Sequence, residues 1–403
     1  MTSPSSGACA EKQLLARCAR TRVSPQIAKE IRALASNKSG ELDGDYLVSE
    51  AANNAVTPLV ALQLRALGSD VAPPGLLERL QAAAHANTVR CLLLSAELLK
   101  IMAEFDSRGI RGIPYKGPAL AAQAYGDMTL REFEDLDVIL PQRDLQKAHD
   151  AMLAMGYAPK FPDIVSPQGA GSFVPGEYNY RDATRRITVE LHTERTLRHF
   201  PVAPDLGDRA TEGSLAARLV PVALGGQTVR TFSPEDGLPI LCVHGAKDFW
   251  ERISWVADIS ELIESQPRLD WDQAFRRAES WKAERMLHLG LALAIELLDA
   301  PLPPEIASRV QKDGVASGLA SEISLRLLSR EKIFLGAAER FRFRRCMLPN
   351  ALDGWRYAIR LAVMPAEEDW FYGRLPRPLA PLYVALRPLR LLRKYFGLAR
   401  HPR

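Results

Sequence analysis

The chain has 403 residues, of which 47% are apolar and 25% are charged, and its net charge is +4. This length allows two or three domains with a sizeable core, and the composition is that of an ordinary soluble globular protein. No uninterrupted apolar run approaches the roughly 20 residues that a membrane span needs, which excludes a membrane-spanning protein.

The cysteine content points to a reducing compartment. There are five cysteines, an odd number, they are widely spaced, and no Cys-x-x-Cys pair occurs. That pattern argues against a disulfide framework or a zinc knuckle. The first residues also lack a basic stretch followed by an apolar core, as a signal peptide would have. We therefore expect a cytoplasmic protein.

The N-terminal part is predicted to be helical. From Lys12 to about Ala86, apolar residues recur at helical spacing in several short segments. Pro73 and Pro74 interrupt this pattern before another predicted helix, and a separate, longer helix is predicted from about residue 87 to 108. Gly109 fits the cap that ends it.

The middle of the chain alternates between extended and helical patterns. The predicted elements, in order, are a short strand at 113–116, a helix at 118–125, a strand at 135–140, a helix at 142–155, a loop at 161–177, and hairpin arms at 178–180 and 187–192. Because Pro114 lacks a backbone donor, the first strand should be weakly paired on one side. This order predicts a mixed α/β (α+β) fold, with a small mixed sheet covered by helices.

From Ser233 onward the pattern is again helical. The chain therefore divides into an N-terminal helical region at 1–88, a mixed core at 89–232, a C-terminal helical region at 233–373 and a tail at 374–403. After Asp369 there are eight basic residues and no acidic one; taking them from the total of +4 leaves −4 for residues 1–369. The tail is thus basic and apolar together, on a mildly acidic body.

Asp135 and Asp137 are the first candidates for chemistry. On a strand the side-chain period is two, so both carboxylates project from one face, while Leu136 and Val138 project from the other. Divalent cations relieve the repulsion between two such carboxylates, and Mg²⁺ prefers carboxylate oxygens together with substrate phosphates. The rival interpretation is a strand edge with two solvated aspartates.

Glu190 and His192 repeat this arrangement in the sequence Val-Glu-Leu-His. If their strand lies beside the first, Glu190 supplies a third carboxylate to the same site. The alternative for Glu190 is an exposed strand face, and for His192 a surface or hydrogen-bonded histidine.

Lys116 and Gly117 lie at a predicted strand-to-helix turn. Free backbone N–H groups at a helix N-terminus suit a phosphate, Gly117 permits close backbone approach, and Lys116 adds a full charge. The alternative is a turn glycine beside a surface lysine. Arg131 either contacts a triphosphate or pairs with Glu134.

Together these residues resemble a known family. The sequence Lys116-Gly117-Pro118, followed by Arg131-x-x-x-Asp135-Leu-Asp137 and then Glu190-x-His192, is similar to the bacterial uncharacterised nucleotidyltransferases of the polymerase-β-type nucleotidyltransferase superfamily. The resemblance covers roughly residues 90–265. It includes the segment from His244 to Asp258, in which we assign no role to His244 or Lys247.

The resemblance implies a Mg²⁺-dependent enzyme with two metal ions. It would move a nucleoside monophosphate from an NTP such as ATP to an acceptor and release pyrophosphate. Asp135, Asp137 and Glu190 would be catalytic and would hold the metal. Lys116, Gly117, Arg131 and His192 would bind the nucleotide.

One departure from the superfamily keeps other functions open. The turn at Lys116-Gly117-Pro118 lacks the second small polar residue of the superfamily's Gly-Gly or Gly-Ser turn. One alternative is therefore a catalytically silent nucleotide-binding or partner-docking module on the same fold. Another is a toxin-like nucleotidyltransferase acting on tRNA, which the basic tail suggests.

The partners follow from the same reasoning. We expect an NTP donor and an acceptor that is a small molecule, a protein or RNA. The tail is either a solvated arm or a weak contact to an anionic membrane surface or nucleic acid. Pro388 is expected to interrupt any long helix there.

Overall fold

The fold is described from a computed structural model of the chain. It describes residues 9–36, 42–68, 72–160, 177–182, 187–193, 201–202, 204–207, 213–363, 379 and 382–395. The predicted loop at 161–177 lies outside these residues, except for Glu177. The turn between the predicted hairpin arms lies largely outside them as well.

Five strands form the predicted mixed sheet. Their order is β1-β2-β5-β4-β3, with β2 and β5 parallel and the other neighbours antiparallel. The bounds are β1 Ile113–Pro114, β2 Asp135–Ile139, β3 Ala158–Pro159, β4 Glu177–Asp182 and β5 Ile187–His192. The weakly paired first strand is confirmed, since β1 is short and lies at the edge of the sheet.

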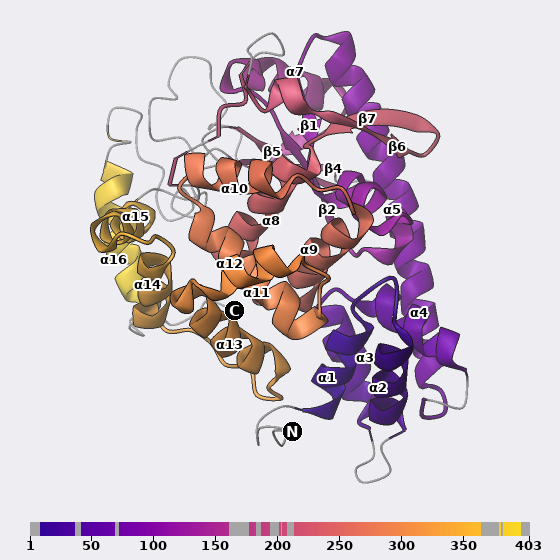
Figure 1. Ribbon diagram of the computed structural model, residues 1–403. Coiled ribbons are helices and arrows are strands. Elements are labelled where there is room, and N and C mark those ends of the chain that lie inside the picture. Colours follow the sequence, from indigo (N-terminus) through magenta and orange to yellow (C-terminus); the bar gives the residue numbers. More distant parts are fainter. Residues whose placement is uncertain are drawn as a thin grey trace.

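Helices make up most of the remaining chain (Figure 1). Before and within the sheet they are α1 Ala10–Cys18, α2 Pro25–Ala35, α3 Gly44–Asn53, α4 Thr57–Leu67, α5 Leu76–Ser107, α6 Gly117–Leu120 and α7 Leu145–Ala154. After it they are α8 Pro234–Lys247, α9 Ile253–Ser265, α10 Trp271–Ser280, α11 Glu284–Leu298, α12 Pro304–Gln311, α13 Gly314–Leu328, α14 Ala337–Cys346, α15 Ala351–Val363 and α16 Leu382–Tyr395. Among the described residues, no helix combines the length and apolarity needed to cross a bilayer.

The long helix α5 corrects the N-terminal prediction. We expected a separate helix before residue 87, but one helix runs unbroken for 32 residues from Leu76 to Ser107. No proline or glycine occurs in this stretch, so nothing interrupts the hydrogen-bond ladder. Gly109, with φ +67°, follows its end as predicted. The helix runs from the N-terminal helices to the sheet (Figure 1).

The apolar face of the sheet packs on α5 and α7. Leu136 and Val138 of β2 and Val189 and Leu191 of β5 are fully buried, and they share a core with apolar side chains of both helices. Because side chains alternate along a strand, the polar residues of β2 and β5 point to the opposite face. Lys247 of α8 forms an ion pair with Glu177 on that face, and Asp258 of α9 forms one with Arg131, which precedes β2.

A second core joins the two helical regions. Buried residues of α1 to α4 belong to the same cluster as those of α8 to α13. The N-terminal helices therefore pack with the C-terminal helices, although the sheet separates them in sequence. The boundaries predicted at residues 88 and 232 stay predictions.

One hairpin was missing from the predicted elements. Strands β6 Val220–Leu224 and β7 Gln227–Thr231 pair antiparallel across Gly225-Gly226, both with positive φ. A Gly-Gly pair between alternating apolar residues is the sequence pattern of a two-residue hairpin turn. That pattern would have been sufficient to predict it.

Candidate functional site

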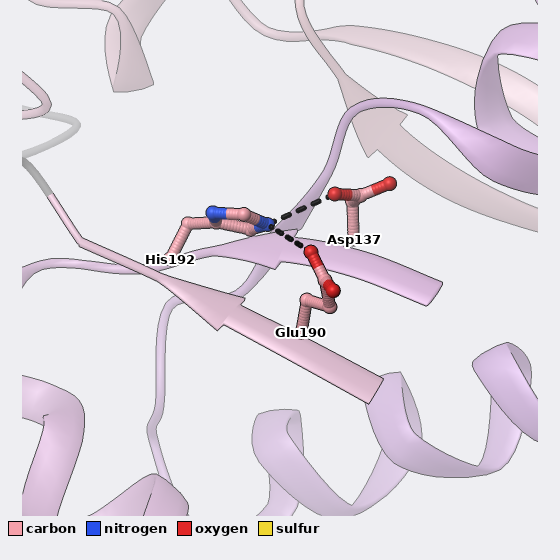
Figure 2. Close-up of side chains that lie close together, drawn as sticks. All are labelled: Asp137, Glu190 and His192. Atoms are coloured by element: carbon pink, nitrogen blue, oxygen red, sulfur yellow. Dashed lines mark hydrogen bonds and ion pairs between the residues drawn. The ribbon is translucent and has the colours of Figure 1, made fainter. Parts of the chain in front are cut away.

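The site is built on two neighbouring parallel strands. Asp137 of β2 lies opposite Glu190 of β5, and Ile139 lies opposite His192. Asp137, Glu190 and His192 all project from the same face of the two strands, as Figure 2 shows. The strand of Glu190 thus lies beside the strand of the two aspartates, as the predicted site requires.

Three side chains converge at this point. His192 Nε2 lies 2.9 Å from Asp137 Oδ1 and 3.6 Å from Glu190 Oε2. One ligand atom from each residue falls within 4.8 Å of the others. Asp137 is 4% exposed and His192 is 3% exposed, so these are interior groups and not a solvated strand edge.

Asp135 lies outside this compact group. It is on the same face of β2 as Asp137, partly buried. Its pKa is raised, first by burial and then by the negative charge of Asp137. Asp135 therefore interacts electrostatically with Asp137 of the site. That Asp135 binds a metal ion stays a prediction.

Lys116 is bound into the cluster. Its Nζ lies 2.7 Å from Asp137 Oδ1, and the side chain is largely buried, so the interpretation as a surface lysine is wrong. Gly117 has φ +51°, and a Cβ there would lie 3.3 Å from the backbone oxygen of Asp135. The turn therefore approaches β2 closely in a backbone conformation that favours glycine.

The charges within the cluster differ sharply. Burial alone would raise the pKa of Asp137, but the Lys116 ammonium and the His192 hydrogen bond hold it well below its usual range. The pKa of Glu190 is raised to about 8 by burial, with Asp137, Glu177 and Asp135 adding to the effect. Glu190 is therefore mostly protonated at neutral pH unless positive charge arrives.

The donor set fits one divalent cation. Asp137 and Glu190 offer carboxylate oxygens, which hard cations prefer, and His192 offers a ring nitrogen. An arriving cation would also offset the repulsion that keeps Glu190 protonated. His192 Nδ1 is buried without a hydrogen-bond partner among the described residues. The metal contact of a ligating histidine is normally supported by such a bond from its other nitrogen. The two carboxylates therefore fit the cation better than His192 does.

Arg131 is held by an aspartate 127 residues away. Its Nε donates to Asp258 Oδ1 at 2.7 Å, and its second terminal nitrogen donates to Asp258 Oδ2 at 2.9 Å. Tyr125 Oη also donates to Asp258 Oδ1, at 2.8 Å. The expected alternative partner Glu134 instead lies 3.8 Å from Arg90. The predicted contact of Arg131 with a nucleotide stays a prediction.

Several nearby residues had no assigned role. The ring of Tyr115 meets that of His192 edge-on at 5.6 Å, and the Lys116 ammonium lies 5.2 Å from the Tyr115 ring centre. Lys247 Nζ lies 3.8 Å from Glu177 Oε2. Burial lowers the pKa of His244 well below its usual value, and Lys116 and Lys247 lower it further. His244 and Lys247 are three residues apart, so the sequence places both on one side of a helix. No sequence pattern predicts that this side faces the sheet.

A family model described as "Uncharacterised nucleotidyltransferase" matches residues 40–299. A solved nucleotidyltransferase-like antigenic protein from Paracoccidioides brasiliensis is similar at 18% identity and a TM-score of 0.32. That likeness covers 55% of this chain and 91% of that chain. A comparison with curated proteins gives no match.

Proposed function

The chain belongs to the uncharacterised nucleotidyltransferase family, and from this premise we propose that it uses Mg²⁺ to move a nucleoside monophosphate from an NTP to an acceptor. The observation that carries the proposal is the convergence of Asp137, Glu190 and His192 within 4.8 Å on the polar face of the sheet. The family match over residues 40–299 extends beyond the resemblance expected at residues 90–265. The matched model says nothing of bacterial origin.

The proposed roles follow from where each side chain lies. Asp137 and Glu190 would hold the cation, with His192 orienting Asp137 through their 2.9 Å hydrogen bond. Asp135 would complete the acidic face if a second ion binds there. A divalent cation, when bound, would supply charge neutralisation for the carboxylates and the phosphates.

Lys116, Gly117 and Arg131 would receive the nucleotide. Lys116 already lies against Asp137, so its ammonium could turn to phosphate oxygens when a cation occupies the acidic cluster. Arg131 is fixed by Asp258 in a two-point contact, which orients its guanidinium. In the transfer, an acceptor oxygen bonds to the α-phosphorus, the bond from that phosphorus to the bridging oxygen breaks, and pyrophosphate leaves with the electron pair. The acceptor's proton passes to a carboxylate of the cluster.

The second candidate is a silent nucleotide-binding module. It is favoured by the turn at Lys116, which lacks a second small polar residue, and by the engagement of Lys116 with Asp137. Such a module would bind NTP in calorimetry and would never release pyrophosphate. Incubation with labelled NTPs, Mg²⁺ and cell extract would identify the donor base and show whether the acceptor is a small molecule, a protein or RNA.

Glu190→Gln gives the sharpest test. With a pKa of about 8, Glu190 is mostly uncharged at pH 7 without metal, and glutamine has nearly the same shape as its protonated form. The variant should therefore melt within a few degrees of the parent. It should nevertheless lose pyrophosphate release from NTPs, Mg²⁺ and cell extract by about a hundredfold or more, because one cation ligand is gone.

The matched control is Glu134→Gln. Glu134 is next to Asp135, but its side chain is 82% exposed and points away from the cluster toward Arg90. It should retain parental turnover. If Mg²⁺ binds the cluster, it should also raise the melting temperature of this variant as much as that of the parent. Full turnover in Glu190→Gln would overturn the assignment. If Glu190→Gln lost turnover but kept Mg²⁺ and NTP binding, Glu190 would act only in the chemical step.

A further inference from the structure

Two helices at one edge of the molecule expose apolar stripes. On α15 the stripe is Leu352, Trp355 and Ile359, and on α16 it is Leu382, Leu386 and Leu389. All six side chains are between 45% and 58% exposed. Neighbouring members of each stripe are three or four residues apart, and the first and last are seven apart. Each set therefore lies on one side of its helix. Two such stripes on consecutive helices are more than the scattered apolar residues of an ordinary surface.

The stripe on α16 is not what attaches the helix to the protein. Val384 and Leu391 are partly buried, and on the helical wheel they lie on the side opposite the leucines. The helix therefore packs on α15 with one side and presents Leu382, Leu386 and Leu389 outward. It also runs through Pro388, which is inside its bounds. The expectation that this proline interrupts the helix is wrong.

Positive charge accompanies the apolar surface. Helix α16 contains Arg387, Arg390, Arg393 and Lys394 and no acidic residue. Across α14, α15 and α16 there are ten basic residues against two acidic ones, Glu339 and Asp353. Part of this charge is neutralised, since Arg340 pairs with Glu251, Arg342 with Glu322 and Arg356 with Asp353. A segment that combines outward leucines with arginines matches the interface of an anionic bilayer, where the acyl chains take the apolar side chains and the headgroups pair with the cations.

The same features disfavour other occupants. RNA would use the arginines, but of the six exposed apolar side chains only the Trp355 indole could stack on a base, and that ring already contacts Phe341 at 5.3 Å and Arg345 at 5.9 Å. A second copy of this surface would bring two α16 helices together, each with four basic residues and no acidic one, which is repulsive. Figure 1 shows α14, α15 and α16 at the edge of the molecule, apart from β2 and β5, so docking there would not cover these strands.

We propose that α15 and α16 form a peripheral docking surface for anionic lipid membranes. The leucines of α16, with Leu352, Trp355 and Ile359 of α15, enter the headgroup region, and the exposed Arg393 of α16 binds the headgroups there. This surface is independent of the nucleotidyl-transfer chemistry, because none of its residues belongs to the site on β2 and β5.

Flotation of the full chain with vesicles tests the proposal. Vesicles of phosphatidylcholine with phosphatidylglycerol should carry the protein, and vesicles of phosphatidylcholine alone should carry about tenfold less. Leu386→Ser with Leu389→Ser should lower the partition coefficient at least about tenfold, because two apolar side chains leave the interface. Arg356→Gln with Arg393→Gln, at two exposed arginines of α15 and α16, should weaken binding similarly and reduce its loss at high salt.

The matched control uses leucines exposed elsewhere. Leu92 and Leu93 on α5 are 54% and 47% exposed, so Leu92→Ser with Leu93→Ser removes the same chemistry from another surface and should float like the parent. Pyrophosphate release should be unchanged in all three double variants. Failure of the parent to float with anionic vesicles would overturn the proposal. Equal flotation of the parent and the leucine variant would overturn it as well. So would a parent that forms a dimer in sedimentation and binds no vesicles, if the leucine variant is a monomer.

Discussion

At the scale of single residues, position in the fold decides the charge of chemically similar groups. Asp137 and Glu190 face each other across two strands, yet the pKa of Asp137 is lowered while that of Glu190 is raised to about 8. The difference lies in their contacts, since Lys116 and His192 both bind Asp137. A cluster that keeps one acid charged and its neighbour protonated is poised to accept positive charge.

A buried acid away from the site follows the same physics. Glu261 of α9 is 1% exposed, and burial raises its pKa to about 7 although it accepts hydrogen bonds from Thr21 N at 2.7 Å and Thr21 Oγ1 at 2.6 Å. The folded protein therefore binds this proton more tightly than the unfolded chain, where the pKa is near 4.5. Stability from this group is complete below about pH 4.5 and is lost as the pH rises through about 7.

Glu261→Gln should remove that dependence. Between pH 5 and pH 8 the free energy of unfolding of the variant, relative to the parent, should rise by on the order of 2 kcal/mol, because only the parent must bury a charge at the higher pH. Urea unfolding at the two pH values measures it. Exposed Glu331→Gln should give the same difference from the parent at both pH values. A pH-independent difference for Glu261→Gln would contradict the pKa.

At the scale of elements, two glycines set how closely the C-terminal helices pack. A Cβ on Gly290 of α11 would lie 2.4 Å from Cys242 Sγ of α8, and one on Gly245 of α8 would lie 2.6 Å from the Trp250 ring. Trp250 is fully buried, just beyond the end of α8. The helices α8 and α11 thus approach each other at a distance that only a residue without a side chain permits.

Gly290→Ala should destabilise the protein by about 1–3 kcal/mol, because the new methyl group overpacks the contact with Cys242. Gly318→Ala is the matched control in α13, where a Cβ meets nothing within 4 Å. It should stabilise the protein by about 0.5–1 kcal/mol, since alanine loses less backbone entropy in a helix. Urea unfolding of both variants checks the opposite signs, and equal effects would show that the close approach is not needed.

At the scale of the whole molecule, α9 ties the helical body to the sheet. Asp258 holds Arg131, which precedes β2, and Glu261 on the same helix holds Thr21 of the N-terminal region. Asp258 is 2% exposed, and the Arg131 side chain is 11% exposed. One rigid helix therefore fixes both an arginine proposed to contact the nucleotide and the N-terminal helices that share its core.

Asp258→Asn should affect both the stability of the fold and the binding of the nucleotide. Leaving a buried arginine without its counter-charge should cost about 3–5 kcal/mol of stability, measured by urea unfolding. If Arg131 contacts the nucleotide, calorimetry should also find NTP binding weakened by about tenfold, with Mg²⁺ binding unchanged. Exposed Asp272→Asn should alter neither quantity. A loss of stability with parental NTP affinity would leave Asp258 a purely structural role.

The sequence determined the local parts of the site. Alternation on a strand put Asp135 with Asp137, and Glu190 with His192, on common faces, and Gly117 marked a turn that needs positive φ. These follow from backbone geometry, which acts over a few residues. The same local reasoning explains why the boundary inside α5 was misplaced, since weak helical periodicity does not reveal whether one helix or two carry it.

Only the tertiary structure decided which distant residues meet. The pairing of β2 with β5, the hold of Asp258 on Arg131 and the outward turn of the leucines on α16 join or separate segments tens to hundreds of residues apart. Such contacts depend on how the core closes, and no local pattern encodes the partner. The sequence thus supplied the acids and their faces, and the closure of the fold supplied the neighbours that set their charge.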